Sequence, residues 1–355
     1  MIHFYILELG FEKVDGDLCV YNLIKSRCIT SFHVDNFYAA GIEKGIEFLI
    51  KGLSAKFVLK HSPTALTLGI EVCQLPDHTV QLEQKAYITR TLIELNLGDM
   101  NPRHTIADQG AVDAVLKGED SALPLNAVEH SFYRSIVGKL MYAMVSTCPD
   151  IFFIVELLGR YNHQPNTLHL AIAKGVVAYL KGIADYVLTY RGGGDSTPTG
   201  WVDSDFAQDC TRKSTTGFVF FMSSGPIAWC SQLQKLVTTS TAEAEYVALF
   251  EATREAVWLR RIARGLEQKI SAPTEIREDN ASAIALTRED ARHTRTKHID
   301  IKYHFTKEKI VDKTVIVTKV AGVDNVADIF TKVQTKERFD MDVKRLSLGS
   351  KSPSA

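Results

Sequence analysis

Apolar and polar residues follow two different periods in the first half of the chain. Runs in which every second residue is apolar predict strands, and apolar residues three and four positions apart predict helices. The expected strands are 18–23, 28–37, 65–73 and 79–82, and the expected helices are 42–53 and 85–97. Helical spacing then dominates from 131 to 188, in stretches such as YRSIVGKLMYAM and HLAIAKGVVAYLKGI. A mixed region therefore passes into a mostly helical one.

From residue 199 onward, strands and helices alternate. Strands are expected at 199–206, 218–222, 227–231, 274–278 and 314–320, and helices at 241–266, 281–287, 301–310 and 326–332. A Ser224-Gly225-Pro226 turn joins the second and third of these strands. Strands and helices mixed in this order predict a mixed-sheet α/β domain, within a chain that is α+β overall.

Two breaks divide the chain. The segment RGGGDSTPTG, from Arg191 to Gly200, is rich in turn residues and marks the main domain boundary. A weaker polar break spans Asn101 to Pro124. We expect a mixed part at 1–110, a helical part at 111–195, an α/β domain at 196–335 and a C-terminal tail at 336–355.

Composition narrows the class of protein. The 355 residues carry a net charge of −1, so no overall positive field indicates nucleic-acid binding, and any basic surface must be local. No apolar run approaches the roughly 18 residues that a membrane helix needs, and the N-terminal segment lacks the features of a signal peptide. The six cysteines form no C-x-x-C pair, which favours reduced, mostly buried thiols in an intracellular protein of the cytoplasm or nucleus.

Two aspartates of the α/β domain are candidate ligands for a metal ion. Asp203 lies within the first strand, in WVDSDFA, on the same face as Trp201 and Asp205. Asp279 ends the fourth strand and opens a helix, and ligand sites in α/β sheets gather at such carboxyl ends. Taken alone, either Asp203 or Asp279 is better explained by a turn or a place on the surface.

The helix expected at 241–266 contains two glutamates, and geometry separates them. Ser240 and Glu243 form an S-x-x-E capping box, which gives Glu243 a structural role at the start of the helix. At about 100° per residue, Glu245 instead shares a stripe with apolar residues. The stripe comprises Leu249, Ala252, Ala256, Leu259 and Ala263. A carboxylate at the end of a buried stripe is costly unless it is paired or bound to metal, so Glu245 is the better candidate ligand.

Asp328, in DNVADIFTK, begins the last expected helix, where the helix dipole explains it equally well, with Asn325 as the cap. The set of four carboxylates is more informative than any member. Mg²⁺ prefers oxygen ligands and takes one or two carboxylates per ion. Two such ions, about 3.5–4 Å apart, can activate a water molecule and stabilise the leaving oxygen of a phosphodiester. A site of this kind, with Mg²⁺ that Mn²⁺ can replace, is therefore the prediction.

Long motifs of the α/β domain resemble those of copia-type retrotransposon ribonuclease H domains. The motifs are DSDFAQDCTRKSTTGFVFFMSSGPIAWCSQLQKLVTTSTAEAEYVAL, EDNASAIAL, RHTRTKHIDIKYHF and VDNVADIFTK, in this order between Gly200 and about Phe339. The resemblance implies an RNase H-like fold and hydrolysis of the RNA strand of RNA–DNA hybrids. The catalytic, metal-binding set that it implies is Asp203, Glu245, Asp279 and Asp328.

The preceding region resembles the reverse transcriptase of the same family, through GFEKVDGDLCVY, LTLGIEV and YRSIVGKLMYAMVSTCPDI. By this resemblance the mixed part is a truncated palm and thumb remnant, and the helical part is a connection region. Because the chain begins late, we expect the fingers and the first palm aspartate to be absent. The second palm motif, Tyr-Val-Asp-Asp in the family, reads His33-Val34-Asp35-Asn36 here. Asparagine lacks the carboxylate charge that a two-metal polymerase needs, so we expect polymerase activity to be lost.

Basic residues lie near the acidic motifs in the sequence. They are Arg292, Arg295, Lys297 and His298 in one short window, and Arg212 and Lys213 in the turn after the first strand of the domain. These residues can hold the phosphates of a hybrid beside the active site, or the window can be an ordinary solvated entry to a helix. His298 can also assist product release.

A second hypothesis is not enzymatic. In it, the chain is a decaying or domesticated retroelement fragment that at most binds nucleic acid. Asn36 and the truncation favour decay of the first region, whereas the four intact carboxylates favour retained nuclease chemistry. An active polymerase is the least favoured reading.

Overall fold

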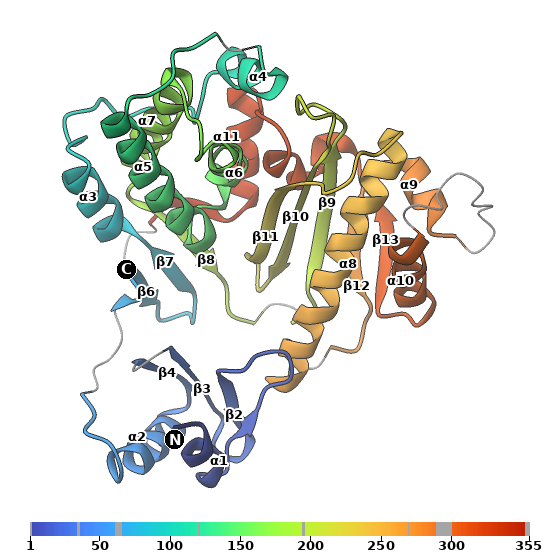
Figure 1. The fold of residues 1–355 in the computed structure, drawn as a ribbon. Coiled ribbons are helices and arrows are strands. Elements are labelled where there is room, and N and C mark those ends of the chain that lie inside the picture. Colours follow the sequence, from blue (N-terminus) through green and yellow to red (C-terminus); the bar gives the residue numbers. More distant parts are fainter. Residues whose placement is uncertain are drawn as a thin grey trace.

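The structure is a computed structural model that describes residues 2–33, 36–60, 66–119, 121–193, 196–268, 270–288 and 300–351. The strands of these residues form three sheets, one of four strands and two of five, surrounded by helices (Figure 1). The chain is therefore mixed α/β, as predicted. Within the described ranges, no helix combines the length and apolar character needed to cross a membrane.

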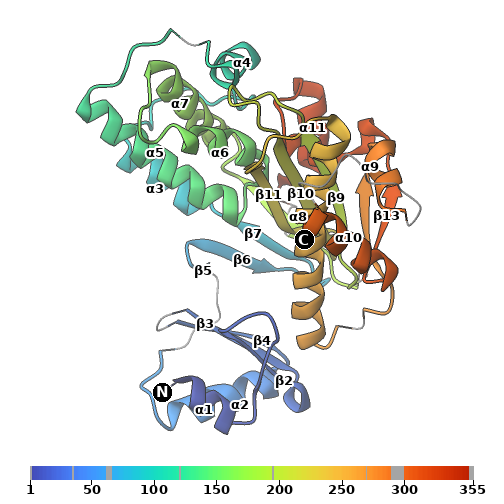
Figure 2. The same ribbon diagram turned by 45° about the vertical axis from the view of Figure 1, so that its right-hand side comes forward.

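The first sheet forms a separate lobe with its own core (Figure 2). Its strands pair antiparallel in chain order: β1 (Glu12–Lys13), β2 (Val20–Leu23), β3 (Cys28–His33) and β4 (Asn36–Gly41). Helices α1 (Ile2–Glu8) and α2 (Glu43–Ser54) pack against it, and a short 3-10 helix, η1 (Ile24–Ser26), joins β2 to β3. The single strand expected at 28–37 is thus two strands, because the chain folds back and pairs Cys28 with Gly41.

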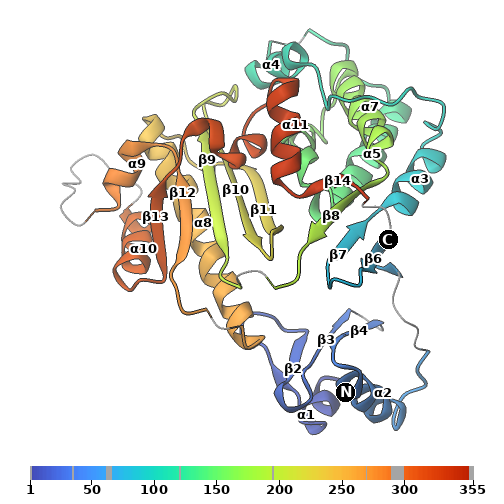
Figure 3. The ribbon, with the colours of Figure 1, turned by 180° about the vertical axis from the view of Figure 1, so that it is seen from behind.

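The second sheet combines strands from distant parts of the chain, in the order β14-β8-β7-β6-β5. They are β5 (Leu66–Thr67), β6 (Ile70–Gln74), β7 (Val80–Glu83), β8 (Tyr186–Tyr190) and β14 (Leu348–Ser350), all antiparallel to their neighbours. β8 overlaps the end of the segment expected to be helical. The segment expected as a C-terminal tail contains helix α11 (Lys336–Arg345) and β14, which lies beside β8 (Figure 3).

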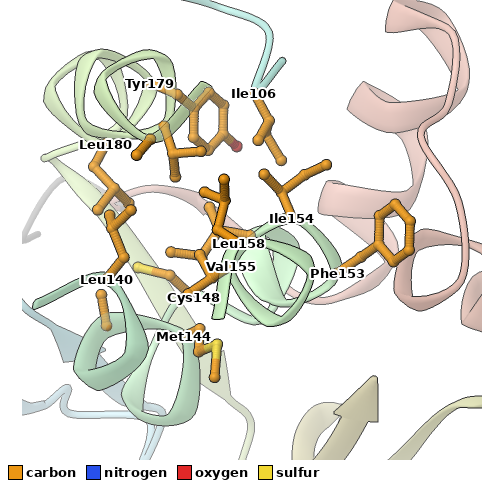
Figure 4. Close-up of a cluster of buried hydrophobic side chains, with 14 of the residues drawn as sticks. Ile106, Leu140, Met144, Cys148, Phe153, Ile154, Val155, Leu158, Tyr179 and Leu180 are labelled. Carbon is orange, nitrogen blue, oxygen red and sulfur yellow. The ribbon is translucent and has the colours of Figure 1, made fainter. Parts of the chain in front are cut away.

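Helices between these strands share one large apolar core. They are α3 (Lys85–Glu94), α4 (Gln109–Lys117), α5 (Ala127–Ser146), the 3-10 helix η2 (Pro149–Ile151), α6 (Phe152–Arg160) and α7 (Thr167–Gly182). Leu140, Leu158 and Leu180 converge from α5, α6 and α7 (Figure 4). Helix α4 lies inside the predicted polar break; the Asp108 side chain caps its start and Gly118, in the left-handed conformation, ends it.

The third sheet has the order β11-β10-β9-β12-β13. Its strands are β9 (Thr199–Asp205), β10 (Thr215–Met222), β11 (Gly225–Leu233), β12 (Thr274–Glu278) and β13 (Val315–Lys319). The first three pair antiparallel, whereas β9, β12 and β13 are parallel. The remaining helices are α8 (Thr241–Gly265), α9 (Ala281–Leu286), α10 (Asp300–Val311) and the 3-10 helices η4 (Gly322–Asp324) and η5 (Val326–Phe330). This is the mixed-sheet α/β domain that the sequence predicts.

Helices cover both faces of the third sheet. Alternate residues of β9 and β10, Val202 and Phe220 among them, pack against α8. Residues of the opposite alternation, such as Val219, join the core of the helical part together with η5. The boundary predicted at Arg191–Gly200 falls between β8 and β9, two strands of different sheets.

Gly217, in β10, allows η5 to lie close to the sheet. A Cβ added there would lie 2.6 Å from Thr331 Cγ2 and 2.9 Å from Phe330 Cβ. Since neither neighbouring atom is the flexible end of a long side chain, an added methyl must push the η5 segment away from β10.

Gly217→Ala should therefore lower the free energy of unfolding by about 1–3 kcal/mol. Gly138→Ala in α5 is the matched control, because a Cβ there meets no atom of the described residues within 4 Å and alanine favours a helix over glycine. Thermal unfolding of both variants tests the expectation. A Gly217→Ala protein as stable as the wild type would contradict the close approach of η5.

Candidate metal centre

Asp203 lies where two parallel strands separate. β9 pairs with β12 from Thr199 to Trp201, and the pairing ends at Trp201 and Arg277. Asp203 and Asp279 each lie two residues beyond that last pair, so their carboxylates face the gap at the carboxyl ends of the strands. Asp203 is buried and accepts a hydrogen bond from the hydroxyl of Thr331.

Glu245 reaches the same gap from the start of α8. The predicted stripe that follows it, from Leu249 to Ala263, is buried. Gln234 fixes the first turn of α8 to the sheet, because its amide donates to Ala244 O at 2.9 Å and to Thr216 Oγ1 at 3.0 Å. One carboxylate oxygen from each of Asp203, Glu245 and Asp279 lies within 4.8 Å of the other two. The structure thus brings together three of the four predicted residues.

Glu243 is directed to the start of its own helix. Its backbone N–H donates to Ser240 Oγ at 3.2 Å, and its carboxylate accepts from the backbone N–H of Thr239 at 2.6 Å. The carboxylate therefore binds the residue before the N-cap, and the capping box predicted from the sequence is only half formed: the Ser240 hydroxyl caps the helix through the N–H of Glu243. Glu243 is also buried, which the sequence did not indicate.

Asp328 lies in η5 and is not part of the three-residue group. Its Oδ1 lies 3.0 Å from Lys332 Nζ, and its Oδ2 lies 3.9 Å from Arg338 Nη2. Its charge contributes to raising the pKa of both Asp203 and Asp279, after burial, which is the largest cause in each case. Asp328 is therefore an electrostatic neighbour of the group, although a lysine stands against its carboxylate.

Asn325 and Arg338 hold the η4–η5 segment against the sheet. The Asn325 amide is buried, donates to Val202 O at 2.9 Å and accepts from the N–H of Ala327 at 3.2 Å. Arg338, in α11, donates to Asn325 O at 2.9 Å and to the carboxylate of Asp342 at 2.8 Å. The position of Asp328 therefore depends on α11, which follows the predicted end of the domain.

Two further carboxyl groups belong to the electrostatic environment of this centre. Glu278 is fully buried at the end of β12, and Asp205 lies at the end of β9. Burial, followed by repulsion from Asp203 and Asp279, raises the pKa of Glu278 well above its ordinary value. The sequence did not identify Glu278 as part of the site, although strand alternation with Ile276 places it on the buried face.

Burial is the main cause of raised pKa values throughout the centre. It raises the pKa of Asp203 to about 6 and that of Asp205 to about 7, although Lys332 opposes both shifts. Burial also raises the pKa of Glu245, with repulsion from Glu278, Asp203 and Asp279 adding to the effect. The positive charge of the described residues is therefore not enough to neutralise this many carboxyl groups in one buried place.

These residues fit a divalent metal ion. Among the described residues, Glu245 Oε2, Glu278 Oε2 and Asp205 Oδ2 are buried without a hydrogen-bond partner. Carboxylate oxygens are the ligands that Mg²⁺ and Mn²⁺ accept, and a bound cation would supply the missing positive charge.

The predicted nucleic-acid contacts are only partly described. Arg292, Arg295, Lys297 and His298 lie outside the described residues. Arg212 is exposed and Lys213 half-buried, in the turn that follows β9. Asp209 shapes this turn, because its carboxylate accepts from the N–H of Thr211 at 2.8 Å and from Arg160 of α6 at 3.1 Å.

The polymerase-like motif lies in the first lobe. His33 ends β3 and pairs with Asn36 at the start of β4, whereas Val34 and Asp35 lie outside the described residues. All six cysteines are free thiols. Cys28 and Cys148 are buried, but Cys210 is exposed and the other three are half-buried, so the expectation of mostly buried thiols was wrong.

Comparison with known proteins finds homologues over nearly the whole chain, although no family model matches it. The retrovirus-related Pol polyprotein from transposon TNT 1-94 of Nicotiana tabacum is 35% identical over 345 residues, which cover 93% of this chain and 25% of the polyprotein. The Pol polyprotein from transposon RE1 of Arabidopsis thaliana is 28% identical over 355 residues, 99% of this chain and 24% of its own. The homologues of this chain over nearly its whole length are therefore copia-type, retrovirus-related Pol polyproteins from transposons, and the chain spans about a quarter of the length of these curated relatives.

Among solved structures, LC11-RNase H1, isolated from compost by a metagenomic approach, aligns with 42% of this chain and 99% of its own. The identity is 14% and the TM-score 0.30.

The raised pKa values predict how stability depends on pH. A carboxyl group with a raised pKa holds its proton more tightly in the folded state, so the free energy of unfolding falls as pH rises from the unfolded pKa to the folded one. For Asp203 and Asp205 this range runs from 3.8 to about 6 and about 7.

In EDTA, Asp203→Asn should therefore gain stability over the wild type as pH rises from about 4 to about 6. Mg²⁺ should stabilise the wild type more at the upper end of this range, because it binds ionised carboxylates. Thermal unfolding across the range, with and without Mg²⁺, measures both effects. If the difference between the two proteins stayed constant with pH, Asp203 would not be the strained group that its burial indicates.

Proposed function

We propose that the α/β domain hydrolyses the RNA strand of RNA–DNA hybrids with two Mg²⁺ ions, which Mn²⁺ can replace. The observation that carries the proposal is the convergence of Asp203, Glu245 and Asp279 from two strand ends and a helix start. Homology to the Pol polyproteins and the ribonuclease H-like motifs support the choice of substrate. When bound, two such ions activate a water molecule and stabilise the leaving oxygen.

The residues of the chain have distinct tasks in this proposal. Asp203, Glu245 and Asp279 would hold the first ion, and Asp203 with Asp328 the second. The hydroxyl of Thr331 fixes the orientation of the Asp203 carboxylate that both positions share. Arg212 and Lys213, in the turn after β9, are placed to contact phosphates of the hybrid.

We further propose that the reverse-transcriptase part does not polymerise. Its support is chemical: Asn36 replaces a carboxylate of the palm motif, and an amide cannot supply the charge that a two-metal site requires. We therefore expect nuclease activity without polymerase activity in this chain.

The two glutamates of α8 provide a matched test of the nuclease. Glu245→Gln should abolish cleavage of a hybrid labelled on its RNA strand, because it removes a metal ligand without changing the shape of the side chain. Glu243→Gln should keep cleavage but lose on the order of 1 kcal/mol of stability, because it weakens charge-assisted hydrogen bonds from Thr239 to the carboxylate. Products should carry 5′-phosphate and 3′-hydroxyl ends, since water and not the 2′-hydroxyl is the nucleophile.

The outcomes separate the two hypotheses. A folded wild-type chain that binds hybrids but cuts them in neither Mg²⁺ nor Mn²⁺ would support the non-enzymatic fragment. Cleavage that persists in Glu245→Gln would show that the convergent carboxylates do not perform the reaction.

No template-directed primer extension should be detectable with the full chain, in Mg²⁺ or Mn²⁺, because the palm motif lacks one of its carboxylates. A primer–template assay with all four deoxynucleotides measures this directly, and the hybrid cleavage assay on the same preparation shows that the protein is active. Extension that tracks the protein through purification would refute the proposal.

A further inference from the structure

Lys332, which closely follows η5, places a positive charge among the carboxylates of the candidate metal centre. Its Nζ lies 3.0 Å from Asp328 Oδ1 and 3.9 Å from Asp203 Oδ2. Its charge also opposes the effect of burial on the pKa of Asp205 and Asp279. The ammonium thus stands between the two carboxylates that the second ion would bridge.

We propose that Lys332 holds the second metal position in the metal-free protein, so that the two ions bind in a fixed order. This inference deepens the proposed two-metal function and rests on it. The first ion enters among Asp203, Glu245 and Asp279 without displacing the lysine. The second ion binds between Asp203 and Asp328 only when the ammonium leaves.

Electrostatics gives the reason for the order. An ammonium and a divalent ion cannot both lie between the same two carboxylates. At a separation of a few ångström the two cations repel each other, and dissolved salt screens little of this repulsion at so short a distance. A monovalent ammonium relieves part of the repulsion between Asp203 and Asp328 while no metal is bound. Because the second ion has to displace this ammonium, it binds more weakly than the first ion.

A displaced Lys332 has another carboxylate within the same cavity. A cavity of about 60 Å³ is lined by Lys332, Asp150, Phe153, Ile329 and Phe339, among others. Asp150 is buried and accepts from the hydroxyl of Tyr179 through one oxygen. Its other oxygen, Oδ1, has no hydrogen-bond partner in the described part of the chain. Side-chain rotation of Lys332 toward Asp150 would pair both groups.

Binding of Mn²⁺ alone to the full chain tests the order of the two ions. Calorimetry gives the two affinities, and electron paramagnetic resonance reports whether two ions lie close together. The wild type should bind one ion tightly and a second weakly. In Lys332→Met the second ion should bind on the order of tenfold more tightly, and the first should change less.

Lys319→Met is the matched control. It removes the same charge beside the centre, but its ammonium donates to the backbone carbonyl of Asp279 at 2.6 Å. In this control the second ion should bind as weakly as in the wild type, because Lys319 contacts Asp279 of the first position. An unchanged ratio in a Lys332→Met protein that melts cooperatively would overturn the proposal, as would loss of both ions from that variant.

The role of Asp150 is tested by a double-mutant cycle. Asp150→Asn should weaken the second ion in the wild-type background, because the displaced lysine loses its alternative partner, and should have no effect in Lys332→Met. Equal effects in both backgrounds would overturn the rotation toward Asp150.

Hybrid cleavage, measured separately, distinguishes this inference from the proposed function. If the ion affinities of the wild type and Lys332→Met differ as expected but neither protein cuts the hybrid, the proposed nuclease activity is refuted and the role of Lys332 is not. If the wild type cuts the hybrid but has the same ratio of ion affinities as Lys332→Met, the role of Lys332 is refuted and the proposed nuclease activity is not.

Discussion

Repulsion between buried carboxylates is the constraint on which the α/β domain depends. Six carboxyl groups influence one another there: Asp203, Asp205, Glu245, Glu278, Asp279 and Asp328. Folding alone would not keep such groups together, because each unpaired buried charge is costly. The surrounding structure therefore has to hold them together mechanically, and the close packing at Gly217 and the buried Asn325 contribute to that hold.

This mechanical hold extends beyond the domain that the sequence outlines. Arg338 and Asp342 of α11 fix the η4–η5 segment, and α11 is followed by β14, which pairs with β8 of the second sheet. Trp229, in β11, donates to Met144 O of α5 at 2.8 Å, so the same sheet is also tied to the helical part. The helical part thus supports the candidate metal centre, together with α11 and β14.

Local patterns predicted most of the elements and the choice between the two glutamates. β12 has the predicted bounds, and the stripe from Leu249 to Ala263 is buried as its spacing indicated. Strand β8 was missed because its partners, β7 and β14, lie about a hundred or more residues away, and no local period records such pairing.

Lys332 was missed for a related reason, since a lysine near the end of a helix is ordinarily explained by the helix dipole. Only the packing of η5 against β9 and β10 shows that its ammonium reaches Asp203. Contacts between residues far apart in the sequence, which composition and periodicity do not record, determine both the position of β8 and the partners of Lys332.

The spacing of Asp328 and Lys332 has a mechanical consequence for the centre. The two residues are four positions apart, so one short segment supplies both a ligand of the second position and the cation that competes for it. Moving the backbone of that segment would remove the ligand together with the competitor. Because Asn325 fixes the backbone before η5 and Thr331 binds the Asp203 carboxylate just after it, the proposed exchange of lysine for metal would occur by rotation of the Lys332 side chain. Because the backbone of this segment is held rigidly, the Lys332 side chain can leave the carboxylates while Asp328 stays in place.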